Sequence, residues 1–267
     1  MLTSVHNERV KSAAALARRN ARSKTGRFLL EGPQAVDEAL TGRHDLVDEV
    51  FVTPGASVRV DGLAATAERL GIRVTEVSDA VLRAIADTVT PQGILAVARQ
   101  APTALEQVLP TQPSLVAILH RIADPGNAGA VLRVADAAGA DAVVFTQGSV
   151  DPYNPKAVRA TTGSLFHLPM TVDAPLEQAV EVARSAGLQV LAADVSGEVL
   201  HSSAAHADLL AQATAWVFGN EAHGLTEEEL ALCDGVIRLP IFGRAESLNL
   251  ATAAAVLLYQ SAFHIRG

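Results

Sequence analysis

The chain has 267 residues, of which 49% are hydrophobic and 19% charged, and its formal net charge is −8. This composition predicts a folded globular protein and excludes an intrinsically disordered one. No apolar run is long enough to cross a bilayer, and the first residues lack the hydrophobic segment of a signal peptide, so we expect a cytoplasmic protein. The single cysteine, Cys233, excludes an internal disulfide and a cysteine zinc cluster.

Positive charge is concentrated at the N-terminus. Residues 1–27 carry seven basic side chains and one acidic one, a local charge of +6, so the other residues carry −14. This asymmetry is typical of a phosphate-binding arm, but an amphipathic helix whose arginines face water gives the same count. The candidate phosphate-binding residues in this stretch are Arg18, Arg19, Arg22, Lys24 and Arg27.

The first part of the chain predicts a small α/β domain, residues 1–99. Its expected strands are 28–30, 47–52, 73–77 and 93–98, and its expected helices are 33–40, 64–70 and 80–86. Residues 100–113 contain three prolines and no periodic pattern, so they are expected to form a linker.

The second predicted domain, residues 114–267, alternates strands and helices. Strands are expected at 114–119, 141–145, 165–169, 188–193, 213–218 and 236–239. Helices are expected at 129–138, 156–160, 176–186 and 226–232, with a long one from 250 onward. Strict alternation of this kind predicts a parallel sheet that is covered on both faces.

Three strand ends in this domain lead into polar, glycine-bearing loops, each followed by a helix. The segments are 120–133 (HRIADPGNAGAVLR), 216–225 (WVFGNEAHGL) and 239–249 (LPIFGRAESLN). Because such loops meet at the carboxyl edge of a parallel sheet, we expect one shared ligand crevice. Taken singly, Ser247 and Asn249 are ordinary caps of the last helix, whose apolar faces predict burial in a core or an interface.

Motifs in these three segments resemble those of a known family. They are NxGxxxR (Asn127 to Arg133), GNExxGL (Gly219 to Leu225) and LPxxGxxxSLNxxxA (Leu239 to Ala253). In this order they look like the signatures of the SpoU/TrmH family of S-adenosylmethionine-dependent RNA ribose 2′-O-methyltransferases. The resemblance covers residues 114–265 strongly and the N-terminal region weakly.

The resemblance implies a fold and an assembly. It implies an α/β SPOUT domain with a deep trefoil knot and a mostly parallel sheet. A small N-terminal domain, similar to a large-subunit ribosomal protein, would bind the RNA substrate. The protein would form a homodimer through its C-terminal domain.

The resemblance also implies roles for individual residues. The catalytic residues would be Arg133, Asn127, Glu221, Ser247 and Asn249. S-adenosylmethionine would lie against Phe218, Gly219, Asn220, Gly224, Leu239, Pro240, Ile241, Gly243, Ser247, Leu248 and Asn249. RNA would contact the five basic residues of the N-terminal stretch together with Arg133, Lys156 and Arg159. No metal is expected, because a sulfonium donor is already activated for methyl transfer.

Each assignment has a simpler alternative. Arg133 could form a salt bridge on a helix surface, Glu221 could cap a helix, and Leu239 and Leu248 could pack in the core. The segment that holds Lys156 and Arg159 could be a solvated loop. For the whole protein, rRNA is the expected substrate and tRNA the alternative, and a non-catalytic RNA-binding protein that keeps the fold is the competing class. A dehydrogenase is disfavoured, because GNAGAV lacks the spacing of GxGxxG.

Overall fold

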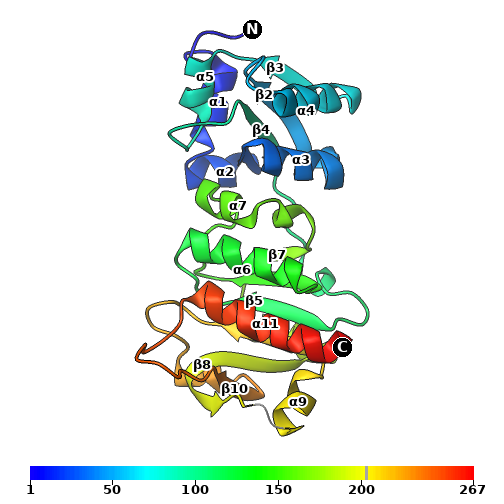
Figure 1. Ribbon diagram of the computed structural model, residues 1–267, viewed down its shortest axis with the longest axis vertical. Helices are drawn as coiled ribbons and strands as arrows, with labels where there is room; N and C mark the ends of the chain where they lie inside the picture. Colours follow the sequence, from blue (N-terminus) through cyan, green and yellow to red (C-terminus); the bar gives the residue numbers. More distant parts are fainter. Residues whose placement is uncertain (202–203) are drawn as a thin grey trace. The chain divides into compact units, whose positions relative to one another are not determined.

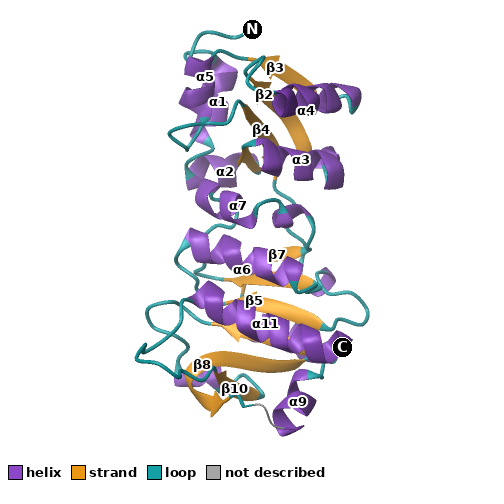
Figure 2. Cartoon of the chain, in the orientation of Figure 1, coloured by secondary structure: helices purple, strands orange, loops and turns teal. Residues whose placement is uncertain are grey.

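The chain forms two compact units (Figures 1 and 2). The computed structural model describes residues 1–201 and 204–267. Unit 1 consists of Met1–Ala101 and Tyr153–His167, and unit 2 of Pro102–Pro152 and Leu168–Gly267. Residues 153–167 therefore pack in unit 1, although they lie within the predicted second domain, residues 114–267. The chain passes between the units three times rather than through one linker.

Unit 1 contains a four-stranded mixed sheet. The strand order is β1-β4-β2-β3, in which β3 is parallel to β2 and the other pairs are antiparallel. The strands are β1 (Arg27–Glu31), β2 (Val47–Val52), β3 (Arg73–Glu76) and β4 (Ile94–Arg99). The helices are α1 (Glu8–Ala15), α2 (Arg19–Thr25), α3 (Pro33–Gly42), α4 (Val58–Arg69), α5 (Asp79–Ile85) and α7 (Pro155–Thr161), with 3-10 turns η1 (His44–Leu46) and η3 (Ser164–Phe166).

The N-terminal helix α1 is amphipathic and belongs to the core of unit 1. Val10 and Ala13 are buried in one cluster with Phe51 and Leu95 of the sheet. The side chain of Asn7 caps the helix by accepting a hydrogen bond from the N–H of Arg9 at 2.9 Å. The apolar side of this stretch thus packs as an amphipathic helix should.

Unit 2 contains a six-stranded sheet in which every pairing is parallel, in the order β10-β8-β9-β5-β6-β7. The prediction of a parallel sheet is therefore confirmed. The strands are β5 (Leu115–Leu119), β6 (Ala142–Thr146), β7 (Met170–Ala174), β8 (Gln189–Val199), β9 (Thr214–Phe218) and β10 (Gly235–Arg238). The helices are α6 (Pro125–Ala137), α8 (Leu176–Ser185), α9 (Ala204–Leu210), α10 (Glu227–Leu230) and α11 (Leu250–Arg266), with the 3-10 turn η2 (Leu105–Gln107).

Helices cover both faces of this sheet, so its central strands are buried at every position. Helices α6 and α11 pack against each other on one face (Figure 1). On that face the indole N–H of Trp216 in β9 donates to the hydroxyl of Ser261 in α11 at 2.9 Å. Residues of α8 pack against Val116 and Ile118 from the other face. No helix of the described residues is long and apolar enough to cross a membrane.

Several elements differ from the prediction, among them α4, which begins at Val58 rather than at residue 64, and α9, which was not predicted. Helix α6 begins at Pro125 rather than at residue 129, because Asp124 caps it by accepting the N–H of Asn127 at 2.8 Å. The strand expected at 165–169 is wrong, since η3 and Pro169 precede the strand β7. Strand β8 continues to Val199, well past residue 193, because it pairs with β10 a second time.

Candidate functional site

The carboxylate of Glu221, which follows β9, joins the second motif to the first. Its Oε2 accepts the backbone N–H of Ala123 at 2.9 Å, and its Oε1 accepts that of Asp124 at 3.1 Å. The same Oε1 accepts the side-chain amide of Asn127 at 3.1 Å. The loop after β9 is thereby fastened to the start of α6, which follows β5.

Asn127 also joins the first motif to the third. Its Oδ1 accepts the amide of Asn249 at 3.0 Å, while Oδ1 of Asn249 accepts the N–H of Ala251 at 2.9 Å and so caps α11. Glu221, Asn127 and Asn249 thus form one hydrogen-bonded chain, which we call the motif triad. These contacts confirm that the three loops meet at one place in the fold, whereas the shared ligand crevice stays a prediction.

The ionisation of Glu221 fixes the orientation of the motif triad. Burial raises the pKa of this carboxyl, but hydrogen bonds from Ala123, Asn127 and Asp124 outweigh it and leave the pKa below its usual value. An ionised carboxylate only accepts hydrogen bonds. Asn127 must therefore turn its NH₂ group toward Glu221 and its oxygen toward Asn249.

The loop after β9 closes tightly on itself. The side chain of Asn220 accepts the N–H groups of Ala222 and His223 at 2.9 and 3.2 Å and donates to the carbonyl of Arg121 at 2.7 Å. Gly224 has φ 64°, a conformation that favours glycine. A Cβ on Gly219 would lie 2.8 Å from the carbonyl carbon of Gly224. Gly219 is thus needed to close the loop itself, a role that the motif alone does not reveal.

The loop of the third motif is open to solvent. Within the described residues, 240–248 form no hydrogen bond, so their main-chain N–H and C=O groups have no protein partner. Phe242 is 95% exposed and Leu248 is 41% exposed, which excludes core packing for the Leu248 side chain in this chain. Ser247 and Gly243 are exposed in the same loop, whereas Leu239 and Pro240 at its start are partly buried.

Arg133 lies on α6 outside the motif triad. Its side chain is exposed and forms no hydrogen bond or ion pair with any residue in the ranges 1–201 and 204–267. The alternative of a surface salt bridge is therefore wrong for this arginine. It remains a free cation on the helix that also presents Asn127.

The predicted RNA-binding residues of unit 1 divide into two groups. Arg18, Arg19 and Lys24 are exposed and have no partner in the described parts of the chain, and Arg27 is exposed but bonds Asp48 at 2.6 Å. The predicted phosphate contact of Arg22 is wrong. Its side chain is only 1% exposed, and its Nη1 donates to the carbonyl oxygens of Leu16 and Ala17, both at 2.9 Å. It holds the connection between α1 and α2 and cannot contact phosphate.

The predicted RNA contact of Arg159, in helix α7, is also wrong. Arg159 donates to the carboxylates of Glu31 at 3.1 Å and Asp87 at 2.9 Å, so its charge is neutralised within unit 1. Glu31 also accepts the N–H and hydroxyl of Thr88 at 3.2 and 2.8 Å. Arg159 therefore holds α7 in unit 1, while Lys156 near the start of α7 is exposed. The alternative of a solvated loop is wrong, since both residues lie in a helix.

A buried cluster at the end of β5 was not predicted from the sequence. Nδ1 of His120 lies 2.9 Å from the hydroxyl of Thr146, and Nε2 lies 3.0 Å from Oε1 of Glu229, which also bonds Arg121. Burial lowers the pKa of His120, although Glu229 opposes this effect. The sequence signal for this cluster is the capping box that starts α10, because it consists of Thr226 and Glu229.

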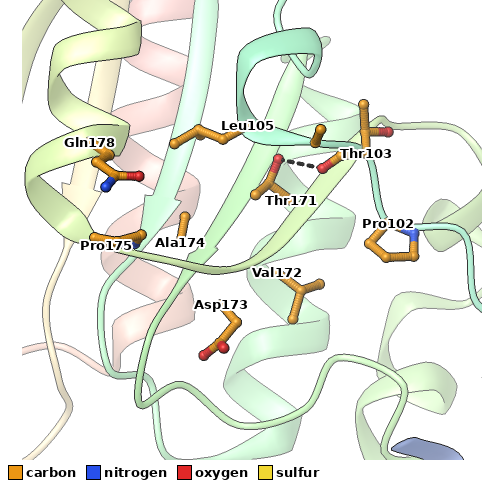
Figure 3. Close-up of a pocket in the computed structure, with 10 residues that line it drawn as sticks. Pro102, Thr103, Leu105, Thr171, Val172, Asp173, Ala174, Pro175 and Gln178 are labelled. Atoms are coloured by element: carbon orange, nitrogen blue, oxygen red, sulfur yellow. Dashed lines mark hydrogen bonds between the residues drawn. The ribbon is translucent and has the colours of Figure 1, made fainter.

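A separate cleft of about 340 Å³ lies beside β7, one of the two edge strands of the sheet (Figure 3). There the hydroxyl of Thr171 donates to the carbonyl of Thr103 at 2.9 Å, so residues 102–105 cover part of the strand edge. Asp173 has φ 65° at a register shift between β6 and β7. The cleft contains no residue of the three motifs, and no group of three metal-ligating side chains occurs among the described residues.

Glycine-bearing loops that converge at the carboxyl edge of a parallel sheet define the class of α/β proteins that bind a nucleotide-like ligand at that edge. Comparison with known proteins is more specific. Residues 114–259 match the model of the SpoU rRNA Methylase family, and residues 7–96 match the MRM3-like substrate binding domain. The chain belongs to the SpoU rRNA methylase family.

Known relatives match this chain over all or nearly all of its length. The 23S rRNA (guanosine(2553)-2′-O)-methyltransferase RlmP of Bacillus subtilis is 34% identical over 100% of this chain and 99% of its own length. The 23S rRNA (uridine(2479)-2′-O)-methyltransferase of Streptomyces viridochromogenes is 31% identical over 93% of this chain and 86% of its own. The AdoMet-bound rRNA methyltransferase of Sinorhizobium meliloti superposes with a TM-score of 0.85 at 30% identity, covering 100% of this chain and 98% of the other.

Proposed function

We propose that this protein transfers a methyl group from S-adenosylmethionine to a ribose 2′-hydroxyl of ribosomal RNA. The observation that carries the proposal is the motif triad, which joins the three family motifs into one site at the carboxyl edge of the sheet. The relatives named above support it, because they match nearly the full chain and are named as 23S rRNA 2′-O-methyltransferases.

The residues present fit this cofactor. The unpaired main-chain groups of 240–248 suit the hydrogen-bonding edge of a purine, and the open space beside Gly243 leaves room for close approach. We assign binding to this loop and to the loop after β9, with the residues from Phe218 to Gly224 and from Leu239 to Asn249 that the motifs indicate. When bound, S-adenosylmethionine supplies a methyl group activated by its sulfonium.

Arg133 is proposed to act on the RNA. A guanidinium keeps its proton in proteins, so a role as general base is physically unfavourable. A free cation on α6 can instead hold a phosphate and stabilise negative charge as it develops on the ribose oxygen. Asn127, Glu221, Ser247 and Asn249 are proposed to orient the ribose and the loops by hydrogen bonds.

Unit 1 is proposed to recognise the RNA, which is consistent with its match to a substrate binding domain. The proposed phosphate contacts are Arg18, Arg19, Lys24 and Arg27, together with Lys156. Arg22 is excluded because it is buried, and Arg159 because two carboxylates of unit 1 neutralise its charge. Phosphate contacts of this kind release counterions, so RNA affinity should fall steeply with salt.

We further propose a homodimer formed through unit 2. Val256, Tyr259 and Phe263 are 39%, 37% and 63% exposed on one side of α11, and the rings of Tyr259 and Phe263 lie 5.7 Å apart. An apolar stripe of this kind is typical of an interface. In the dimer, Arg133 of one subunit would complete the site of the other. We also propose that unit 2 contains a deep trefoil knot and that the protein is cytoplasmic.

Thermal unfolding separates this enzyme from a non-catalytic RNA-binding protein of the same fold. A ligand that binds only the native state stabilises it by about 2.7 kcal/mol at a concentration of 100 times its Kd. We expect S-adenosylmethionine at saturation to raise the melting temperature by several degrees, and adenosine triphosphate at equal concentration to leave it unchanged. An unchanged melting temperature with S-adenosylmethionine would favour the non-catalytic protein.

A further inference from the structure

Strand β8 lies between the two strands that lead into the proposed cofactor loops. In the sheet order β10-β8-β9, the loop after β9 holds Gly219 to Gly224, and the loop after β10 holds residues 239–249. Ala193 of β8 pairs with Phe218 of β9, so Asp194 lies at the level of Gly219. No family motif includes Asp194.

At Asp194 the strand leaves its regular pairing. On β10, Val236 pairs with Ala192, but the next residue, Ile237, pairs with Glu198, so residues 193–197 form an excursion of β8 that has no partner on β10. Gly197 closes this excursion, since a Cβ there would lie 2.5 Å from the carbonyl of Val236. The excursion is therefore a built feature of the strand end, as bulges next to binding sites commonly are.

The two oxygens of Asp194 have different surroundings. Oδ1 accepts the N–H of Ser196 at 2.9 Å and its hydroxyl at 2.8 Å, which fixes the side chain. Oδ2 lies 3.0 Å from the position that a Cβ on Gly224 would occupy, and it accepts no hydrogen bond within the described residues. One carboxylate oxygen is thus held against the glycine loop with its hydrogen-bonding capacity unused.

We propose that Oδ2 of Asp194 is a further cofactor-binding group, which accepts a hydrogen bond from S-adenosylmethionine. This inference rests on the proposed function. The cofactor offers two kinds of donor for a carboxylate, the hydroxyls of its ribose and its ammonium group. Carboxylates at strand ends bind ribose hydroxyls in other nucleotide-binding sheets, and an ammonium group forms an equally favourable charge-assisted bond.

Asp194→Asn is a sharp test, because asparagine keeps an oxygen for the N–H of Ser196 but turns an NH₂ group toward Gly224. We expect this variant to raise the dissociation constant for S-adenosylmethionine, measured by calorimetry, by about 10-fold or more. Ser196→Ala is the matched control, since it removes one hydrogen bond within the turn and leaves Oδ2 in place. Its cofactor affinity should equal that of the wild type.

The compound 5′-methylthioadenosine, which has the ribose but no ammonium group, identifies the donor. Equal weakening of both compounds by Asp194→Asn assigns the ribose hydroxyls, and weakening of S-adenosylmethionine alone assigns the ammonium group. If Asp194→Asn binds S-adenosylmethionine as tightly as the wild type does, the inference is overturned while the proposed function stands. If the wild type does not bind S-adenosylmethionine at all, the proposed function fails as well.

Discussion

Replacing Arg133 with alanine is expected to lower the rate of methyl transfer by roughly 100-fold or more, as removal of a group that stabilises a developing oxyanion does. Affinity for S-adenosylmethionine should remain within about 3-fold of wild type, because Arg133 lies outside the motif triad and the proposed cofactor loops. The side chain has no partner within the described residues, so its loss should not alter stability. Single-turnover rates with saturating RNA, together with calorimetry, measure the two effects separately.

Arg133→Lys is the control for charge. Lysine keeps the positive charge but loses the planar fork that binds phosphate through two hydrogen bonds. An intermediate rate would therefore be consistent with a phosphate clamp. Full activity in Arg133→Ala would remove this arginine from the mechanism.

Replacing Gly219 with valine is expected to weaken S-adenosylmethionine binding by about 10- to 100-fold, in line with the cost of overpacking a tight site. A Cβ at this position would lie 2.8 Å from both the carbonyl carbon of Gly224 and Cγ of Leu225. The loop after β9 would have to open, and Asn220 and Glu221 would move with it. Calorimetry with the cofactor measures the loss, and unchanged affinity would mean that the cofactor does not bind at this loop.

Gly243→Val is the control for Gly219→Val, because it adds the same side chain at a position where its Cβ meets no other atom of the protein. No atom lies within 4 Å of a Cβ built on Gly243, and the residue does not have a positive φ. The melting temperature of this variant should equal that of wild type. If its cofactor affinity falls nonetheless, the loss comes from contact with the ligand rather than from a disturbed loop.

Mixing the Arg133→Ala and Gly219→Val variants, at a cofactor concentration too low to fill the weakened site of Gly219→Val, tests whether Arg133 acts across the proposed dimer. In a mixed dimer, the subunit with Arg133→Ala keeps its cofactor loops, and the subunit with Gly219→Val supplies an intact Arg133. Random pairing makes half of the dimers mixed, each with one complete site, so about a quarter of the wild-type activity should return. No recovery after subunit exchange would mean that Arg133 acts in its own subunit.

The sequence predicts the fold of unit 2 well, because the buried strands are continuous apolar runs with helical patterns between them. The convergence of Glu221, Asn127 and Asn249 was predictable for a related reason. Parallel strands place the loops that follow them at one edge, whatever the order of the strands. Short polar motifs after such strands therefore locate a site without knowledge of its contacts.

Long-range pairing was not predictable in the same way. Residues 153–167 read as a loop and helix of the second domain, yet Arg159 pairs with Glu31 and Asp87, which are distant in sequence. Arg22 reads as one cation among several, yet its guanidinium satisfies the carbonyls of Leu16 and Ala17. The excursion of β8 at residues 193–197 depends on its pairing with β10, and local sequence does not encode that pairing.

The most direct test of the proposed function is to incubate the purified protein with ribosomal RNA and S-adenosylmethionine that carries a labelled methyl group, and then to hydrolyse the RNA in alkali. Methylation of a 2′-hydroxyl blocks alkaline cleavage of the adjacent phosphodiester. We predict that the label is recovered in alkali-resistant dinucleotides from a single position. Label recovered only in mononucleotides, or no label although the cofactor binds, would contradict methyl transfer to ribose.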